Sequence, residues 1–233
     1  MAKQIAITGA SGLIGSALVG QLKSHGHSVK KLVRRAPIGA EEVQWDPTTG
    51  YVDLEALEGV DAVIHLASFP RQKVVNLNPQ LGSRVMIEGL LNLLEYSVAF
   101  GVKKFVHLSS SMVYGDFADN ITEDSMCNPI GSYGIMKLAG EWLVKDYARR
   151  TGMEYVIIRP SAVYGPYDVE DRVASKFLLA ALRNENIYVN GADERLDFTW
   201  VEDAAAGIVG ATLCDAAVNQ TFNITKGQGY TLK

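Results

Sequence analysis

The sequence has few cysteines, no excess of positive charge and no long apolar run, and each absence excludes a class of protein. Its two cysteines, Cys127 and Cys214, lie far apart without metal-ligand spacing, so we expect free thiols in a reducing compartment. The net charge of −4 argues against a nucleic-acid partner, because contacts with phosphates need a basic face. No apolar run approaches the roughly 20 residues that span a bilayer, and the chain enters a strand-like run at once, without a signal-peptide pattern. We therefore expect a cytoplasmic protein with a small-molecule substrate and without a metal, nucleic-acid or membrane partner.

Apolar runs alternate with helical patterns along the 233 residues, which is typical of a parallel sheet with helices on both faces. The apolar fraction of 48% is ordinary for a globular chain, and this length can hold one large domain with a small lobe. The patterns predict strands at 5–8, 28–33, 43–45, 62–66, 105–109 and 155–159. They predict helices at 13–25, 79–100, 132–151, 172–183 and 202–214. The predicted fold class is α/β, with a doubly wound parallel sheet.

Gly9, Gly12 and Gly15 stand between the first predicted strand and the first predicted helix. Because Gly9 and Gly12 lack Cβ, the chain can turn sharply there and a pyrophosphate can approach the backbone. A helix N-terminus also leaves N–H groups unpaired and carries partial positive charge, which suits a phosphate. We expect Gly15 to let the helix pack closely on the strand. The strand before the turn and a second strand about 20 residues later favour dinucleotide binding over a purely structural turn.

The spacing T-G-x-x-G-x-x-G at 8–15, with SSSMVYG at 109–115 and Y-x-x-x-K at 133–137, resembles the extended short-chain dehydrogenases/reductases, specifically the NAD-dependent epimerase/dehydratase family. The segments at 89–110 and 158–166 carry further parts of that family's pattern. The resemblance implies a Rossmann-type sheet, a nicotinamide cofactor and a homodimer formed through the helices at 79–100 and 132–151. The cofactor-binding residues it implies are Gly9, Ser11, Gly12, Leu13, Ile14, Gly15, Asp46, Leu66, Ala67, Ser68, Ser109, Tyr133, Lys137 and Pro160.

The end of the second predicted strand bears on which dinucleotide is bound. NAD-binding folds usually place an acidic residue there for the ribose 2′-hydroxyl, whereas this chain has Val33 followed by Arg34 and Arg35. A guanidinium can bind a 2′-phosphate through two hydrogen bonds, so we predict NADP in preference to NAD. The alternative is that both arginines are simply solvated. For Asp46, which the resemblance places at the adenine, the alternative is a turn-initiating role before Pro47.

The predicted catalytic residues are Ser110, Tyr133 and Lys137. Tyr133 and Lys137 are four residues apart and so share one helical face. A tyrosine of pKa ~10 is a poor base near neutrality, but a nearby ammonium and an oxidised nicotinamide ring can lower its pKa. Tyr133 would then exchange a proton with a substrate hydroxyl or carbonyl while Ser110 orients the same oxygen. The resemblance selects Ser110 from its neighbours Ser109 and Ser111.

Other positions bear on the substrate. Ser110, Ser111 and Arg195 are the predicted substrate-binding residues, Arg195 as a phosphate or carboxylate ligand or else as part of a structural ion pair. Ser111 and Met112 stand where related dehydratases carry an Asp-Glu pair, which argues against dehydration. Met86 and Ala162 replace two asparagines of the family pattern, so the resemblance does not by itself fix a nucleotide sugar as the substrate.

Two functions from different classes follow from these features. The first is an NAD(P)-dependent oxidoreductase or epimerase that moves a hydride at a secondary alcohol or ketone carbon of a sugar or nucleotide sugar, with Tyr-Lys-Ser acid–base catalysis. The second is a catalytically silent dinucleotide-binding sensor or scaffold. The combination of Ser110, Tyr133 and Lys137 favours the enzyme. We expect a dinucleotide-binding domain at 1–165 and, at 166–233, a partial, apparently truncated substrate lobe interleaved with the last strands of the sheet.

Overall fold

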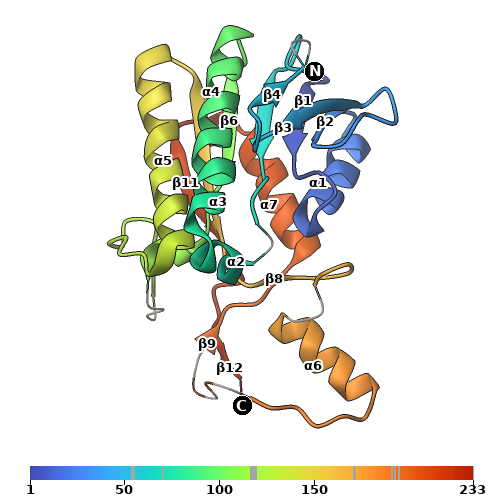
Figure 1. The fold of residues 1–233 in the computed structure, drawn as a ribbon, viewed down its shortest axis with the longest axis vertical. Coiled ribbons are helices and arrows are strands. Elements are labelled where there is room, and N and C mark those ends of the chain that lie inside the picture. Colours follow the sequence, from blue (N-terminus) through green and yellow to red (C-terminus); the bar gives the residue numbers. More distant parts are fainter. Residues whose placement is uncertain are drawn as a thin grey trace.

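A large twisted sheet occupies the middle of the molecule, with helices on both of its faces (Figure 1). The computed structural model describes residues 1–53, 56–69, 71–115, 120–169, 172–189, 191, 193 and 195–232. Within this part of the chain, eight strands form the sheet in the order β11-β7-β6-β5-β1-β2-β3-β4. All of its neighbouring strands are parallel except β3 and β4. The predicted α/β fold with a doubly wound parallel sheet is confirmed.

The strands of the main sheet are β1 Gln4–Thr8, β2 Ser28–Val33, β3 Glu42–Asp46, β4 Tyr51–Val52, β5 Ala62–His65, β6 Lys104–Leu108, β7 Glu154–Pro160 and β11 Gln220–Ile224. Two small sheets are formed by β8 Val163–Tyr164 with β10 Thr199–Trp200, and by β9 Arg195–Leu196 with β12 Tyr230–Thr231. The helices are α1 Leu13–Ser24, α2 Gln72–Leu77, α3 Pro79–Ser83, the π-helical η1 Arg84–Glu88, α4 Gly89–Ala99, the 3₁₀ turn η2 Ser111–Tyr114, α5 Gly131–Thr151, α6 Val173–Leu182, α7 Val201–Leu213 and the 3₁₀ turn η3 Asp215–Ala217.

The sheet reverses its winding direction at β1, which pairs with β2 on one side and with β5 on the other. The chain runs outward from β1 through β2 and β3, and then returns to build β5, β6 and β7 on the opposite side. In open α/β sheets, ligands bind outside the carboxyl ends of the strands at such a switch point. The loops after β1, β5 and β6 therefore define the edge on which to look for a site.

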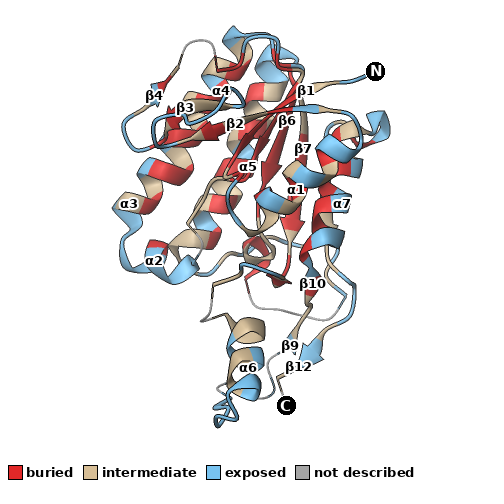
Figure 2. Cartoon of the chain, turned by 90° about the vertical axis from the view of Figure 1, so that its right-hand side faces the viewer, coloured by how far each residue is buried: buried red, intermediate tan, exposed pale blue. Residues whose placement is uncertain are grey.

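Two apolar layers hold the helices to the sheet, as the band of buried strands in Figure 2 shows. On one face, Leu18 of α1 and Ile208 of α7 pack with Ile5 and Ile7 of β1. On the other face, Leu94 of α4 and Val144 of α5 pack with residues of β5 and β6. Because both faces are covered, the central strands are mostly apolar and do not alternate with polar residues, which is the pattern that made them predictable.

The helix predicted at 79–100 contains a π-helical turn that the sequence did not reveal. α3, η1 and α4 follow one another without a break, so the helix is confirmed, but Arg84–Glu88 carry the wider hydrogen-bonding pattern. π-helical turns often occur at functional sites. The buried Met86, which stands at the position of a family asparagine, lies inside this turn.

The segments after β7 extend beyond the carboxyl edge of the main sheet. Figure 1 shows α6, β9 and β12 on that side, whereas α7 and β11 return to the main layers. Ten residues form α6, and none of them is buried. No helix in the described ranges has both the length and the apolar character that a membrane crossing requires.

Candidate active site

The glycine turn after β1 packs directly against the loop after β5. Gly9 has φ +71°, and a Cβ there would lie 3.1 Å from the backbone nitrogen of Ala67. A Cβ on Gly15 would lie 2.2 Å from the carbonyl oxygen of Gly9, so only glycine allows α1 to approach this closely. The predicted close packing at Gly15 is confirmed. Leu13 and Ile14, at the start of α1, pack against a small cluster that includes Val163.

The start of α1 is suited to an anion. Gly12 is the N-cap and supplies no side-chain hydrogen bond, and the first turn carries no acidic residue. Ser11 and Gly12 are exposed, so the N–H groups of this turn can reach a ligand. These features fit a pyrophosphate at the helix N-terminus.

The loop after β5 is fixed to β1 through Thr8. The Thr8 Oγ1 lies 2.9 Å from His65 Nδ1 and accepts a hydrogen bond of 3.1 Å from the backbone N–H of Ala67. Leu66, Ala67 and Ser68 therefore border the glycine turn, as the resemblance implies for a groove that holds the cofactor.

The three predicted catalytic residues meet at the carboxyl end of β6. The buried Lys137 Nζ lies 5.8 Å from the centre of the Tyr133 ring and donates a hydrogen bond of 2.7 Å to the carbonyl oxygen of Leu108. The hydroxyls of Ser68 and Ser110 both act on the Tyr133 phenol and favour its ionised form. Thus side chains from α5 and from the loops after β5 and β6 come together around Tyr133.

The pKa of the Tyr133 phenol in the protein alone is set mainly by its burial. Burial raises the pKa of the phenol, and this outweighs Ser68, Arg172 and Ser110, which lower it. Burial also lowers the pKa of Lys137, to about 8, against an opposing effect of Glu141. In the protein alone, the phenol is therefore a neutral proton donor.

The residues predicted at the adenosine end take separate roles. Arg35 forms two hydrogen bonds of 2.7 Å with the carboxylate of Glu42, so its guanidinium is already engaged. Asp46 accepts hydrogen bonds from the backbone and hydroxyl of Thr48, which is the turn geometry that its alternative role predicted. The pKa of Asp46 is lowered mainly by Thr48, with a contribution from Arg34. Arg34 and Asp46 thus lie near one another at the ends of β2 and β3.

The remaining predicted residues are less closely grouped. The Ser109 hydroxyl points into the core and donates a hydrogen bond to Glu141. The Ser110 Oγ accepts a hydrogen bond from the backbone N–H of Met112, two residues later in the chain. Ser111 begins η2 and Pro160 ends β7. Arg195 lies on β9 and donates to the carbonyl oxygen of Gly229.

Three residues near the site were missed by the sequence analysis. Asn76 accepts a hydrogen bond from the backbone N–H of Tyr133, Arg172 acts electrostatically on the Tyr133 phenol, and Glu141 acts on Lys137. For Glu141, its position four residues after Lys137 was an available signal, because such residues share a helical face. Asn76 and Arg172 lie in other segments, and only the fold brings them to Tyr133.

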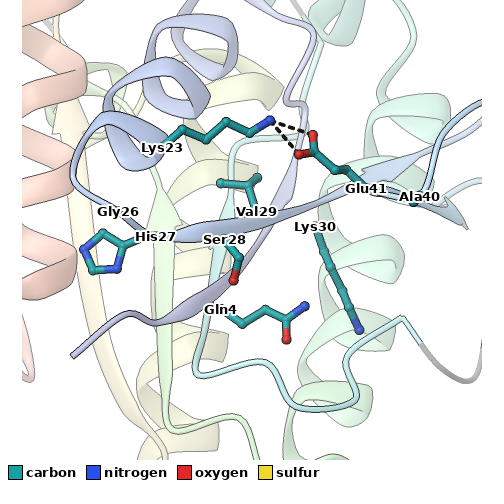
Figure 3. A pocket seen from close by; sticks show the side chains of 9 residues that line it. All are labelled: Gln4, Lys23, Gly26, His27, Ser28, Val29, Lys30, Ala40 and Glu41. Atoms are coloured by element: carbon teal, nitrogen blue, oxygen red, sulfur yellow. Dashed lines mark hydrogen bonds and ion pairs between the residues drawn. The ribbon is translucent and has the colours of Figure 1, made fainter.

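A surface pocket lies at the opposite edge of the sheet, at the amino ends of β1 and β2 (Figure 3). Its walls include Lys23, His27 and Glu41, and Lys23 donates to both carboxylate oxygens of Glu41 (2.6 and 2.7 Å). This pocket is at the wrong edge for a site at the switch point, and its main charges neutralise one another.

Comparisons with known proteins agree with this geometry. A model of the "NAD dependent epimerase/dehydratase family" matches residues 5–225. The "Uncharacterized UDP-glucose epimerase YtcB" of Bacillus subtilis is 30% identical over 172 residues, which are 72% of this chain and 54% of that protein. A UDP-glucose 4-epimerase of Mycolicibacterium smegmatis is 31% identical over 95% of this chain and 76% of its own. The chain spans about half the length of the first curated relatives that it matches, 52–54%.

Solved structures with the same architecture include enzymes with bound nucleotides. MoeE5, in complex with UDP-glucose and NAD, has a TM-score of 0.89 and 30% identity over 98% of this chain and 78% of its own. The UDP-glucuronic acid 4-epimerase of Bacillus cereus, in complex with UDP-glucuronic acid and NAD, has a TM-score of 0.86 and 26% identity over 98% of this chain and 79% of its own.

Proposed function

The chain belongs to the NAD-dependent epimerase/dehydratase family, and we propose that it is an NAD(P)-dependent epimerase of a uridine diphosphate sugar. The observation that carries the proposal is the grouping of Tyr133, Lys137 and Ser110 beside the glycine turn, at the carboxyl edge of the sheet. Similarity to MoeE5 and to the Bacillus cereus 4-epimerase, both solved with a UDP-sugar and NAD, supports this substrate class.

The residues of the glycine turn fit a dinucleotide. A Cβ would clash at Gly15 and would be in tight contact at Gly9 and Gly12, so the turn stays close to the backbone and leaves the N–H groups of α1 open to a pyrophosphate. Leu66, Ala67 and Ser68 would line the groove toward the nicotinamide. When bound, the oxidised cofactor supplies a hydride acceptor and a positive charge beside the phenol.

Residues of the chain would transfer the proton of the sugar hydroxyl. Tyr133 would accept the proton of the sugar hydroxyl while that carbon is oxidised, and would return a proton to the same oxygen when the carbon is reduced again. Lys137 favours the phenolate through its charge, and Ser110 donates a hydrogen bond to the sugar oxygen. Because burial raises the pKa of Tyr133 in the protein alone, we expect the positive charge of the bound oxidised cofactor to favour formation of the base.

The preference for NADP remains our prediction, and it now depends on Arg34. Arg35 is occupied by Glu42, whereas Arg34 forms no ion pair within the described part of the chain and lies near Asp46. A 2′-phosphate at this edge would meet the Arg34 guanidinium. MoeE5 and the Bacillus cereus 4-epimerase were solved with NAD, so both dinucleotides belong in the test.

We also propose a homodimer formed through α4 and α5, because Ile135 and Trp142 of α5 are 53% and 67% exposed. Residues 1–165 are proposed as the dinucleotide-binding domain, and residues 166–233 as the substrate lobe interleaved with α7 and β11. The free thiols of Cys127 and Cys214 support a cytoplasmic location.

The test is to incubate the full chain with NAD⁺ or NADP⁺ and either UDP-glucose or UDP-glucuronate, and to follow the 4-epimer by NMR. Tyr133→Phe should lower kcat by about 10²–10⁴-fold while the dinucleotide still binds. Tyr147→Phe, also on α5, removes a hydroxyl that contacts Glu95 of α4 and serves as the matched control. Dinucleotide binding without any epimer would instead support the sensor or scaffold.

A further inference from the structure

A single buried carboxylate, that of Glu141, joins three elements behind the site. Glu141 lies on α5, one turn after Lys137, and its side chain is 0% exposed. Its Oε1 accepts hydrogen bonds from Ser109 Oγ and from Arg159 Nε (2.9 Å), and its Oε2 accepts one from Arg159 Nη2 (2.6 Å). Ser109 follows β6 and Arg159 lies on β7, so the carboxylate fixes α5 to both strands.

Two side chains of α5 hold the residues that directly precede Ser110 in the chain. Leu108 accepts from Lys137 Nζ through its carbonyl oxygen, and Ser109 donates to Glu141 through its hydroxyl. Two consecutive residues before Ser110 are therefore held by two side chains of α5. Because Tyr133 also lies on α5, the same helix positions both Ser110 and Tyr133, the two side chains proposed to contact the sugar oxygen.

Arg159 extends the hydrogen-bond network to the residues that follow Ser110 in the chain. Its Nη1 donates to the hydroxyl of Tyr114 (2.8 Å), which in turn donates to Asn223 Oδ1 on β11 (2.8 Å). Tyr114 ends η2, the turn that begins directly after Ser110. The segment that carries Ser110 is thus fastened at both ends to groups that meet at Glu141 and Arg159.

Glu141 also determines the charge around Lys137. Burial keeps His65 on β5 and His107 on β6 neutral, because it lowers the pKa of both rings. Tyr133 faces Lys137 from its own helix, and Arg159 on β7 faces Glu141. Glu141 is the group that favours the ammonium form of Lys137 against burial. Buried ion pairs can often be replaced by apolar residues without loss of stability, so stability alone does not explain this one.

We propose that Glu141 is a positioning residue: through Ser109 and Arg159 it sets Ser110 against Tyr133, and its negative charge keeps Lys137 an ammonium. The role in catalysis rests on the proposed function. The role in the charge of Lys137 can be measured without substrate, which separates a failure of this inference from a failure of the proposed function.

The first test follows the lysine Cε signals of the full ¹³C-lysine-labelled chain by NMR across pH, with Lys137 assigned by its loss in Lys137→Arg. Glu141→Gln should lower the titration midpoint of Lys137 by about one pH unit or more. The alkaline limb of the kcat profile should fall at correspondingly lower pH, while the Kd of the dinucleotide changes less than about twofold. Glu95→Gln, which removes a carboxylate bound to Tyr147 at the other end of α5, should leave both unchanged.

The second test separates position from charge and does not depend on the folding of Glu141→Gln. Ser109→Ala keeps the carboxylate but removes one bond that holds the chain before Ser110. It should lower kcat about tenfold while the Lys137 midpoint stays as in the wild type. An unchanged Lys137 midpoint in folded Glu141→Gln would overturn the charge role, and wild-type kcat in Ser109→Ala would overturn the positioning role. A wild-type chain that epimerises no nucleotide sugar overturns the proposed function instead.

Discussion

The side-chain oxygen of Asn76 accepts a hydrogen bond of 2.9 Å from the backbone N–H of Tyr133. Asn76 lies on α2, in the segment that follows β5, and Tyr133 lies in the first turn of α5. Gly131 packs against the same amide, since a Cβ on it would lie 2.9 Å from Asn76 Nδ2. The start of α5 is therefore held by a residue from the segment that follows β5.

Asn76→Ala should lower kcat more than it weakens dinucleotide binding, because it frees the first turn of α5 without touching the glycine turn. Loss of such a cap costs about 1 kcal/mol of stability. Asn78→Ala is the control, since Asn78 is the N-cap of α3 and accepts from the backbone N–H of Leu81, not from that of Tyr133. Equal loss of kcat in the two variants would contradict the positioning of Tyr133 by Asn76.

Acid should unfold the protein through two buried histidines. Burial lowers the pKa of His65 to about 3 and holds that of His107 well below its usual value. Between pH 6.5 and about 3 the unfolded chain therefore binds protons that the folded chain does not, so the free energy of unfolding falls as pH falls. Each ring contributes about 1.4 kcal/mol per pH unit below pH 6.5.

His107→Leu tests this dependence, because neither ring nitrogen of His107 has a hydrogen-bond partner in the described part of the chain. The variant should lose less stability than the wild type between pH 7 and pH 4.5 in urea unfolding. The exposed His25 offers the control His25→Leu, which should follow the wild-type curve. A His107→Leu curve parallel to that of the wild type would show that His107 is not kept neutral.

The choice of dinucleotide should depend on Arg34 and not on Arg35. Arg34→Ala should raise the Kd of NADP(H) at least about tenfold and that of NAD(H) little, because a charge-assisted bond to the 2′-phosphate is lost. Arg35→Ala is the matched control, since its guanidinium is bound to Glu42. Calorimetry with both dinucleotides measures these effects. A wild-type chain that binds NAD(H) as tightly as NADP(H) would contradict the preference.

Ala162 should be strained. Its φ of +33° lies in a region that residues with a Cβ rarely adopt, and its carbonyl oxygen accepts from the backbone N–H of Thr199. Ala162→Gly should therefore raise stability by about 0.5–1 kcal/mol. The same substitution at the exposed Ala206, inside α7, should lower stability by about 1 kcal/mol. Thermal unfolding of both variants measures these changes in stability. A change of the same sign in both variants would argue against strain at Ala162.

The main layers could be predicted because their information is local. Buried strands such as β1 and β5 are continuous apolar runs, and the glycine turn is recognisable by the spacing of its glycines. The π-helical turn at 84–88 was not predictable, since apolar residues recur across 79–100 much as they would in a regular helix. The two-residue strands of the small sheets are too short to show any periodicity.

The site was only partly predictable for a different reason. Tyr133 and Lys137 could be found because four residues on a helix bring them together. Asn76 lies 57 residues from Tyr133 and Arg159 lies 18 from Glu141, so no local pattern pairs them. The raised pKa of Tyr133 in the protein alone was not predictable, because the sequence does not show how deeply the phenol is buried.

The most direct test of the account follows the hydrogen on the reacting carbon. The full chain is incubated in ordinary water with a UDP-sugar carrying deuterium at C4, and the product is analysed by NMR and mass spectrometry. Because the hydride leaves and returns within one site while Tyr133 handles only the hydroxyl proton, the 4-epimer should retain the deuterium at C4. An epimer that has lost deuterium to the solvent, or a dinucleotide-bound chain that forms no epimer from any UDP-sugar tried, would contradict it.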